Sequence, residues 1–117
     1  MKKTDKKIDK QLRQCLTNVC EDHFESIHGF VWLSHEVNFN SINVSLRVIC
    51  VFDNNENQAM FESSSAKEMA VEYVQKSLQS ININLKNATK QIRFDSEERC
   101  KLEHNGNWAN RIAQKYR

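Results

Sequence analysis

Two cysteines and two histidines lie within 14 positions near the start of the chain, and thiolates and imidazoles are ligands that zinc prefers. They are Cys15, Cys20, His23 and His28. In a continuous helix Cys20 and His23 share a face, but Cys15 lies about 140° away from Cys20 at 3.6 residues per turn. Because one tetrahedral ion cannot collect all four side chains, we predict neither a metal site nor a cofactor.

A catalytic cysteine needs a positioned histidine beside it in a cleft. Cys50 lies in the most apolar stretch of the chain, where burial keeps a thiol neutral and unreactive. His35 falls on an apolar strand face, which is typical of a buried histidine. Two glycines, Gly29 and Gly106, are too few for a phosphate-binding loop. We therefore predict a non-catalytic protein, and a small enzyme with Cys or His chemistry is the least favoured alternative.

Basic residues gather at both ends of the chain. Residues 1–13 carry six bases against two acids, and residues 110–117 add three bases and no acid. This asymmetry indicates an anionic partner, either nucleic acid or an acidic protein, although solvated ends that keep the chain soluble would give the same pattern. The side chains that we expect to contact phosphates are Lys3, Lys6, Lys7, Lys10, Arg111 and Lys115.

The spacing of apolar residues predicts the elements that must position these side chains. Apolar residues recur every three or four positions from Ile8 to Ile27, which predicts a long amphipathic helix that ends at Gly29. Alternation over 30–39 and 44–52 predicts two strands. The second half of the latter strand is apolar on both sides and is expected to be covered on both faces.

The second half of the chain predicts a further helix, a strand and a short third helix. Helical spacing returns over 65–81, and strand residues are expected at 83–85 and 92–94. Ser96 precedes two glutamates, which is a favourable helix start. The tail over 108–116 has the four-residue spacing of a last helix.

These elements predict one α+β domain over residues 1–117, with basic N-terminal and C-terminal segments. The order α-β-β-α-β-α corresponds to a two-layer sandwich in which two amphipathic helices back a small sheet. No apolar run reaches the roughly 18 residues that cross a bilayer, and the charged start lacks an export signal. We expect a cytoplasmic protein with no membrane contact and with reduced cysteines.

Two tryptophans are candidates for contacts with a partner. Trp32 falls on the non-core face of its strand, where it can stack on a base, pack under a helix or contact another subunit. Trp108 lies in the basic tail, where it can contact nucleic acid or another protein, or cover the sheet edge. A homodimer that pairs through an uncovered sheet face or edge, anchored by either tryptophan, is the second functional hypothesis.

Four stretches resemble a small bacterial family whose members are sometimes labelled Fis-family transcriptional regulators. They are KTDKKI at 3–8, GFVWLSHEVNF at 29–39, SLRVICVFD at 45–53 and NGNWANRI at 105–112. The resemblance covers most of the chain and implies a regulator of transcription. Fis-type factors are all-helical and end in a helix-turn-helix, whereas this sequence has two β-rich stretches and a tail too short for that motif. No DNA-reading residue can be transferred from the family.

Overall fold

The computed structural model describes residues 2–117 and is an α+β fold, as the sequence predicts. In chain order the elements are α1 (Lys3–Asp22), the short 3-10 helix η1 (Phe24–Ser26), β1 (Phe30–Glu36), α2 (Ile42–Ser45), β2 (Arg47–Phe52), α3 (Asn55–Glu62), α4 (Ser65–Gln79), α5 (Ala88–Gln91), β3 (Ile92–Ser96), α6 (Glu97–His104) and α7 (Trp108–Lys115).

The three strands form one mixed sheet in the order β1-β2-β3. β1 runs antiparallel to β2, whereas β2 and β3 are parallel and are joined by the crossover that contains α3, α4 and α5. Cys50 in the central strand lies between Leu33 of β1 and Phe94 of β3. Because of these directions, β1 ends at the same end of the sheet where β2 and β3 begin.

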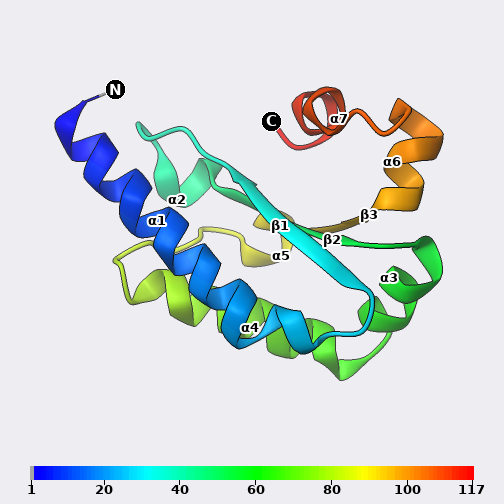
Figure 1. Cartoon of the computed structure of the whole chain (residues 1–117). Helices are drawn as coiled ribbons and strands as arrows, with labels where there is room; N and C mark the ends of the chain where they lie inside the picture. Colours follow the sequence, from blue (N-terminus) through cyan, green and yellow to red (C-terminus); the bar gives the residue numbers. More distant parts are fainter. Residues whose placement is uncertain (1) are drawn as a thin grey trace.

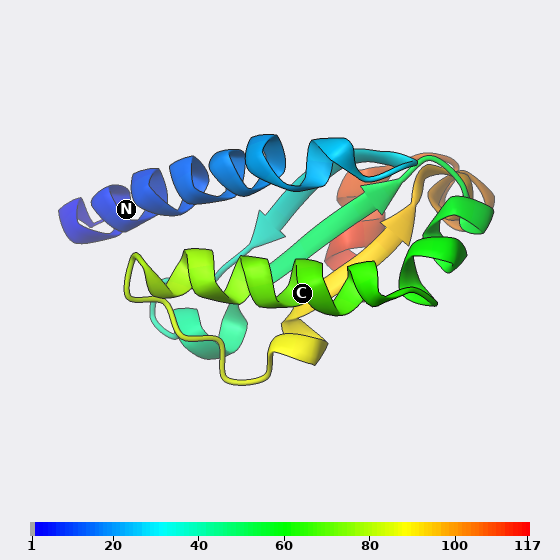
Figure 2. The same ribbon diagram turned by 90° about the horizontal axis from the view of Figure 1, so that it is seen from below.

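The two long helices α1 and α4 cover one face of the sheet (Figures 1 and 2). Leu12, Leu16 and Val19 of α1 and Val74 and Leu78 of α4 are buried. They pack against the sheet residues at alternate positions, which project to the same face. The predicted backing of the sheet by two amphipathic helices is confirmed.

The C-terminal helix α7 lies on the opposite face and adds a partial third layer (Figure 1). Ile49 and Val51 of β2 are buried there together with Tyr116. Trp32 and Trp108 pack around this second cluster with their ring centroids 4.7 Å apart. The central strand is thus covered on both faces, which explains why its alternation is lost in the sequence.

Three local predictions have a clear structural outcome. α1 ends at Asp22 instead of running to Gly29. Gly29 is nevertheless required, because its φ is +84° and a Cβ there would lie 2.6 Å from the Cβ of Asn57.

The expected strand at 83–85 is wrong: Ile83 is buried in a loop, and its N–H donates to the Leu78 carbonyl at the end of α4. Asn105, with φ +52°, ends α6 as predicted.

No helix within residues 2–117 combines the length and the apolar character of a bilayer-spanning segment.

Candidate nucleic-acid interface

Charge is segregated along the direction of the strands. Glu36 of β1 lies opposite Arg47 of β2 in the strand register, at the end of the sheet where β1 finishes. We call this end the basic end. The N-terminal half of α1 lies beyond it (Figure 2), and the C-terminus is held there by an ion pair of 3.3 Å between Arg117 and Glu36. Of the 17 bases and 15 acids in the chain, this end holds twelve bases and three acids.

The twelve bases of the basic end are Lys2, Lys3, Lys6, Lys7, Lys10, Arg13, Arg47, Lys86, Lys90, Arg93, Lys115 and Arg117. The three acids are Asp5, Asp9 and Glu36. At the opposite end, which we call the acidic end, β2 and β3 run into Asp53 and Glu97.

The α1 lysines form a lysine stripe, defined here as Lys3, Lys6, Lys7 and Lys10. At 3.6 residues per turn these four positions fall within an arc of about 100° that lies opposite the buried face of α1. All four side chains are exposed, and among residues 2–117 none of the four forms an ion pair. The predicted phosphate contacts on α1 are therefore accessible as a single convex strip.

A second group of bases surrounds Tyr116, and we call it the Tyr116 patch. The Arg93 guanidinium lies 5.3 Å from the centre of the Tyr116 ring, and the Lys115 ammonium lies 5.8 Å from it. Arg47 and Arg117 line a groove of about 320 Å³ on the same tyrosine. Of these four bases, only Lys115 is predicted from the sequence to contact phosphates.

Arg47 and Arg93 had a signal in the sequence that was missed. Each is a polar residue beside a buried apolar strand residue, Arg47 before Val48 and Arg93 after Ile92. The alternation of a strand turns both arginines to the face opposite the α1 and α4 core, where they meet the C-terminus. Basic residues at the starts of neighbouring parallel strands were the pattern to look for.

Arg111 is not part of this surface, and its selection as a phosphate contact is wrong. The residue is fully buried. Its Nε donates to Asp95 Oδ2 at 2.7 Å and its Nη2 to Oδ1 at 2.9 Å, while Nη1 donates to Glu103 Oε1 at 2.9 Å. The guanidinium therefore links α7 to β3 and α6, and it is not accessible to a phosphate.

Asp95 is the centre of this buried network, and both of its carboxylate oxygens accept hydrogen bonds. Besides Arg111, the carboxylate accepts the Tyr116 hydroxyl at 2.6 Å and the Ser96 N–H at 2.8 Å. Burial alone would raise the pKa of Asp95, but the hydrogen bonds from Arg111 and Tyr116 hold it below its usual value. Burial and the adjacent Asp95 raise the pKa of Tyr116.

The carboxylates of the acidic end also carry structural hydrogen bonds. Glu97 accepts the indole N–H of Trp32 and that of Trp108, the latter at 3.0 Å. Glu98 accepts the backbone N–H of Asn55 at 2.9 Å. Both tryptophans predicted as partner contacts are therefore half-buried and held within the chain.

Neither the thiols nor the histidines assemble into a reactive group. Within residues 2–117, no three His, Cys, Asp or Glu side chains gather where they could hold a metal ion. Burial raises the pKa of the Cys15, Cys50 and Cys100 thiols, which keeps them protonated. Burial also lowers the pKa of His35, mainly through loss of hydration.

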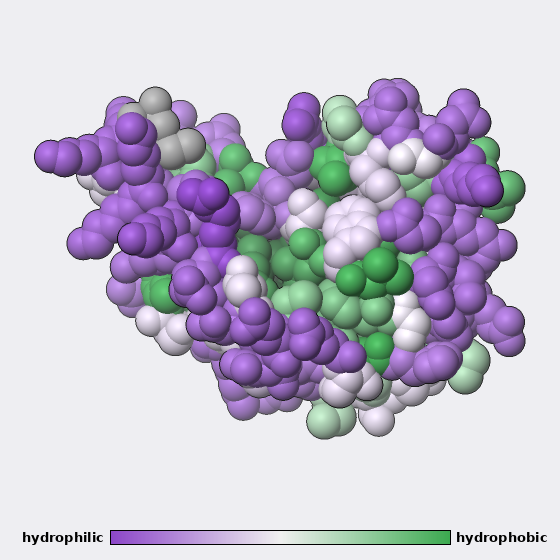
Figure 3. Space-filling view, viewed as in Figure 1, coloured by the Kyte–Doolittle hydropathy of each residue, from purple (hydrophilic) through white to green (hydrophobic). Residues whose placement is uncertain are grey.

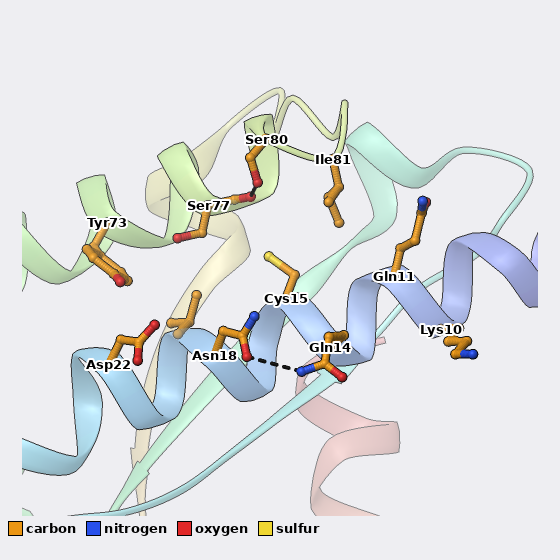
Figure 4. Close-up of a pocket in the computed structure, with 11 residues that line it drawn as sticks. Lys10, Gln11, Gln14, Cys15, Asn18, Asp22, Tyr73, Ser77, Ser80 and Ile81 are labelled. Carbon is orange, nitrogen blue, oxygen red and sulfur yellow. Dashed lines mark hydrogen bonds between the residues drawn. The ribbon is translucent and has the colours of Figure 1, made fainter.

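A groove of about 440 Å³ lies between α1 and α4, on the far side of α1 from β1 (Figure 4). Cys15 and Val19 form part of its floor, and its rim carries amides such as Gln14, which donates to Asn18 at 3.1 Å. No histidine is among the described residues that line it. The exposed lining of the groove is mainly apolar, with polar side chains around it.

Fold and surface together define a small α+β domain with a mixed three-stranded sheet and opposite charge at its two ends. No protein-family model, curated protein or solved structure matches the chain.

Proposed function

We propose that this protein is a non-catalytic binding domain that holds nucleic acid on its basic end. The observation that carries the proposal is the excess of bases there: twelve bases face three acids, only Arg13 and Arg117 form ion pairs within residues 2–117, and the lysine stripe has no intramolecular carboxylate partner in that range. Cations with no structural partner are available to neutralise phosphates.

The shape of the lysine stripe favours a regular polyanion over an acidic protein. The stripe runs from Lys3 to Lys10, about 10 Å along the helix axis, which matches about three nucleotides at 3.4 Å per nucleotide. No apolar side chain interrupts it, whereas protein–protein interfaces have an apolar core with a polar rim.

The Tyr116 patch adds guanidinium groups to the lysine stripe. Arg93 presents a planar donor that can contact two phosphate oxygens at once, which ammonium groups do less specifically. Nη1 of Arg47 donates to the carbonyls of Val44 and Leu46, so its other N–H groups are the ones available to a phosphate. Since these contacts address the backbone, we expect affinity with little choice of sequence.

The test is fluorescence anisotropy with a labelled DNA duplex and a labelled RNA strand, titrated at several salt concentrations. Wild-type affinity should fall linearly with salt on a double-logarithmic plot. The K6Q/K10Q variant should weaken binding to the duplex and lower the slope by roughly 1–2, because each phosphate contact contributes about 0.9.

A matched control removes two lysines outside the basic end. K76Q/K101Q changes the net charge by the same amount, and both residues are exposed, on α4 and α6. It should leave the affinity within about twofold of wild type. The absence of binding at low salt, or equal losses in the two double variants, would overturn the proposal.

A further inference from the structure

β1 is the open edge of the sheet. It pairs with β2 on one side, and within residues 2–117 no strand pairs with its other side. The opposite edge, β3, is covered by α3, from which Gln58 Nε2 donates to the Phe94 carbonyl at 3.2 Å. An edge strand presents unpaired N–H and C=O groups that another strand can use.

The surface along this edge is apolar and hollowed. A band of apolar surface lies over β1 between the polar surfaces of α1 and α7 (Figure 3), and Val31 within β1 is half exposed. A groove of about 370 Å³ follows the edge, with Leu33 and Ser34 of β1 on one side and Thr17 of α1 on the other. A register shift at Val31 confines the regular part of the edge to Trp32–Glu36.

On the α1 side of this groove, a positive and a negative side chain lie on either side of its middle. Arg13, Thr17 and Glu21 are spaced by four residues and line the same groove. Arg13 lies towards the end of β1 and Glu21 towards its start, because the chain reverses direction between α1 and β1. Thr17 and Ser34, at the centres of the two segments, both border the groove.

We propose that this edge binds a second copy of the chain, with β1 pairing antiparallel to β1 of the partner about a two-fold axis near Ser34 and Thr17. That axis brings Arg13 of each copy beside Glu21 of the other on the α1 layer. The same two-fold axis therefore satisfies both the strand pairing and the charges on α1. The assembly stops at a dimer because the open edge of each copy is then occupied. None of the four stripe lysines lines the groove, whereas Arg13 belongs both to the basic end and to this contact.

Charge reversal tests the symmetric pairing by sedimentation velocity over a wide concentration range. R13E and E21R should each raise the dimer dissociation constant roughly tenfold, because two symmetric pairs become repulsive. R13E/E21R should return it to within about threefold of wild type, because the exchanged charges face each other again. Arg13 also pairs with Asp9 of its own helix at 2.9 Å, a contact that R13E and the double variant lose equally.

T17R provides a second disruption that leaves the monomer intact, because Thr17 is exposed and arginine favours a helix. It places like charges on the axis and should produce a monomer with an unchanged circular dichroism spectrum. A wild-type protein that stays monomeric at the highest concentration reached, or a double variant no better than its single parents, would overturn the dimer. Either result leaves the anisotropy experiment unaffected.

Discussion

The two ends of the sheet use their charges differently. At the acidic end, carboxylates accept hydrogen bonds that hold elements together: Asp95 binds Arg111 and Tyr116, and Glu97 binds two indoles. At the basic end the lysine stripe makes no ion pair within residues 2–117. The acidic charges at one end therefore stabilise the fold, whereas the lysine stripe at the other end is free for a partner.

Of the substitutions considered, removal of Asp95 should lower the unfolding free energy most. D95A leaves the buried Arg111 guanidinium with only the half-exposed Glu103 as a counter-charge, and a broken buried pair costs about 3–5 kcal/mol of unfolding free energy. Urea unfolding followed by tryptophan fluorescence measures the loss. The double variant D95L/R111M should be less destabilised than D95A, since no charge stays buried. Equal stability of D95A and wild type would contradict the structural role.

The same carboxylate should make the unfolding free energy decrease at acidic pH. The folded pKa of Asp95 is lowered, so its contribution is complete above the unfolded value of about 3.9 and is lost as the pH falls through the folded value. Urea unfolding at a series of acidic pH values should show wild-type stability declining more steeply than that of D95L/R111M.

Tyr116→Phe should have the next largest effect. The variant loses a hydrogen bond to a charged acceptor, worth about 1.5–3 kcal/mol. Because the pKa of Tyr116 is raised in the fold, its contribution is complete below the unfolded value of about 10 and is lost as the pH rises further. The difference between wild type and variant should shrink above that pH, and a constant difference would argue against this coupling.

Glu97→Gln should cost less, because the site is half-buried and glutamine keeps one carbonyl acceptor. Its amide group cannot accept the second indole N–H, which predicts a loss of about 1–2 kcal/mol. Glu72→Gln is the matched control on an exposed ion pair with Lys76 and should cost under about 1 kcal/mol. Similar losses in both would remove the distinction between buried and solvated carboxylates.

The K6Q/K10Q variant should have the smallest effect on stability while binding nucleic acid less tightly. Each substitution lies on a solvated helix face and should change the unfolding free energy by no more than about 0.5 kcal/mol. Thermal unfolding by circular dichroism measures it. A large destabilisation would show that these lysines serve the fold after all.

Periodicity predicts most of the fold, because the core is built from regular faces of helices and strands. The apolar face of α1, the apolar run of β2 and the Ser96 cap, whose hydroxyl accepts the Arg99 N–H at 3.0 Å, follow from neighbouring residues. The strand expected at 83–85 fails because Ile83 is buried by a turn against Leu78 and not by a partner strand.

The candidate surface could be predicted only in part, because a charge is free or paired according to residues far along the chain. Lys6 and Lys10 are exposed on one helix, so their spacing suffices. Arg111 differs because its partner Asp95 is 16 positions away on a strand, and burial of the pair depends on how α7 packs. Arg93 joins the surface only through tertiary proximity to Tyr116.

The most direct test of the account is an NMR titration of the ¹⁵N-labelled protein with a short oligonucleotide at low salt. If the basic end binds nucleic acid, shift changes should concentrate in residues 2–13, around Arg47 and Arg93, and at residues 115–117, and they should vanish as salt is raised. Changes centred on Asp53, Glu97 or the groove between α1 and α4, or no changes at all, would contradict the assignment of the basic end as the nucleic-acid surface.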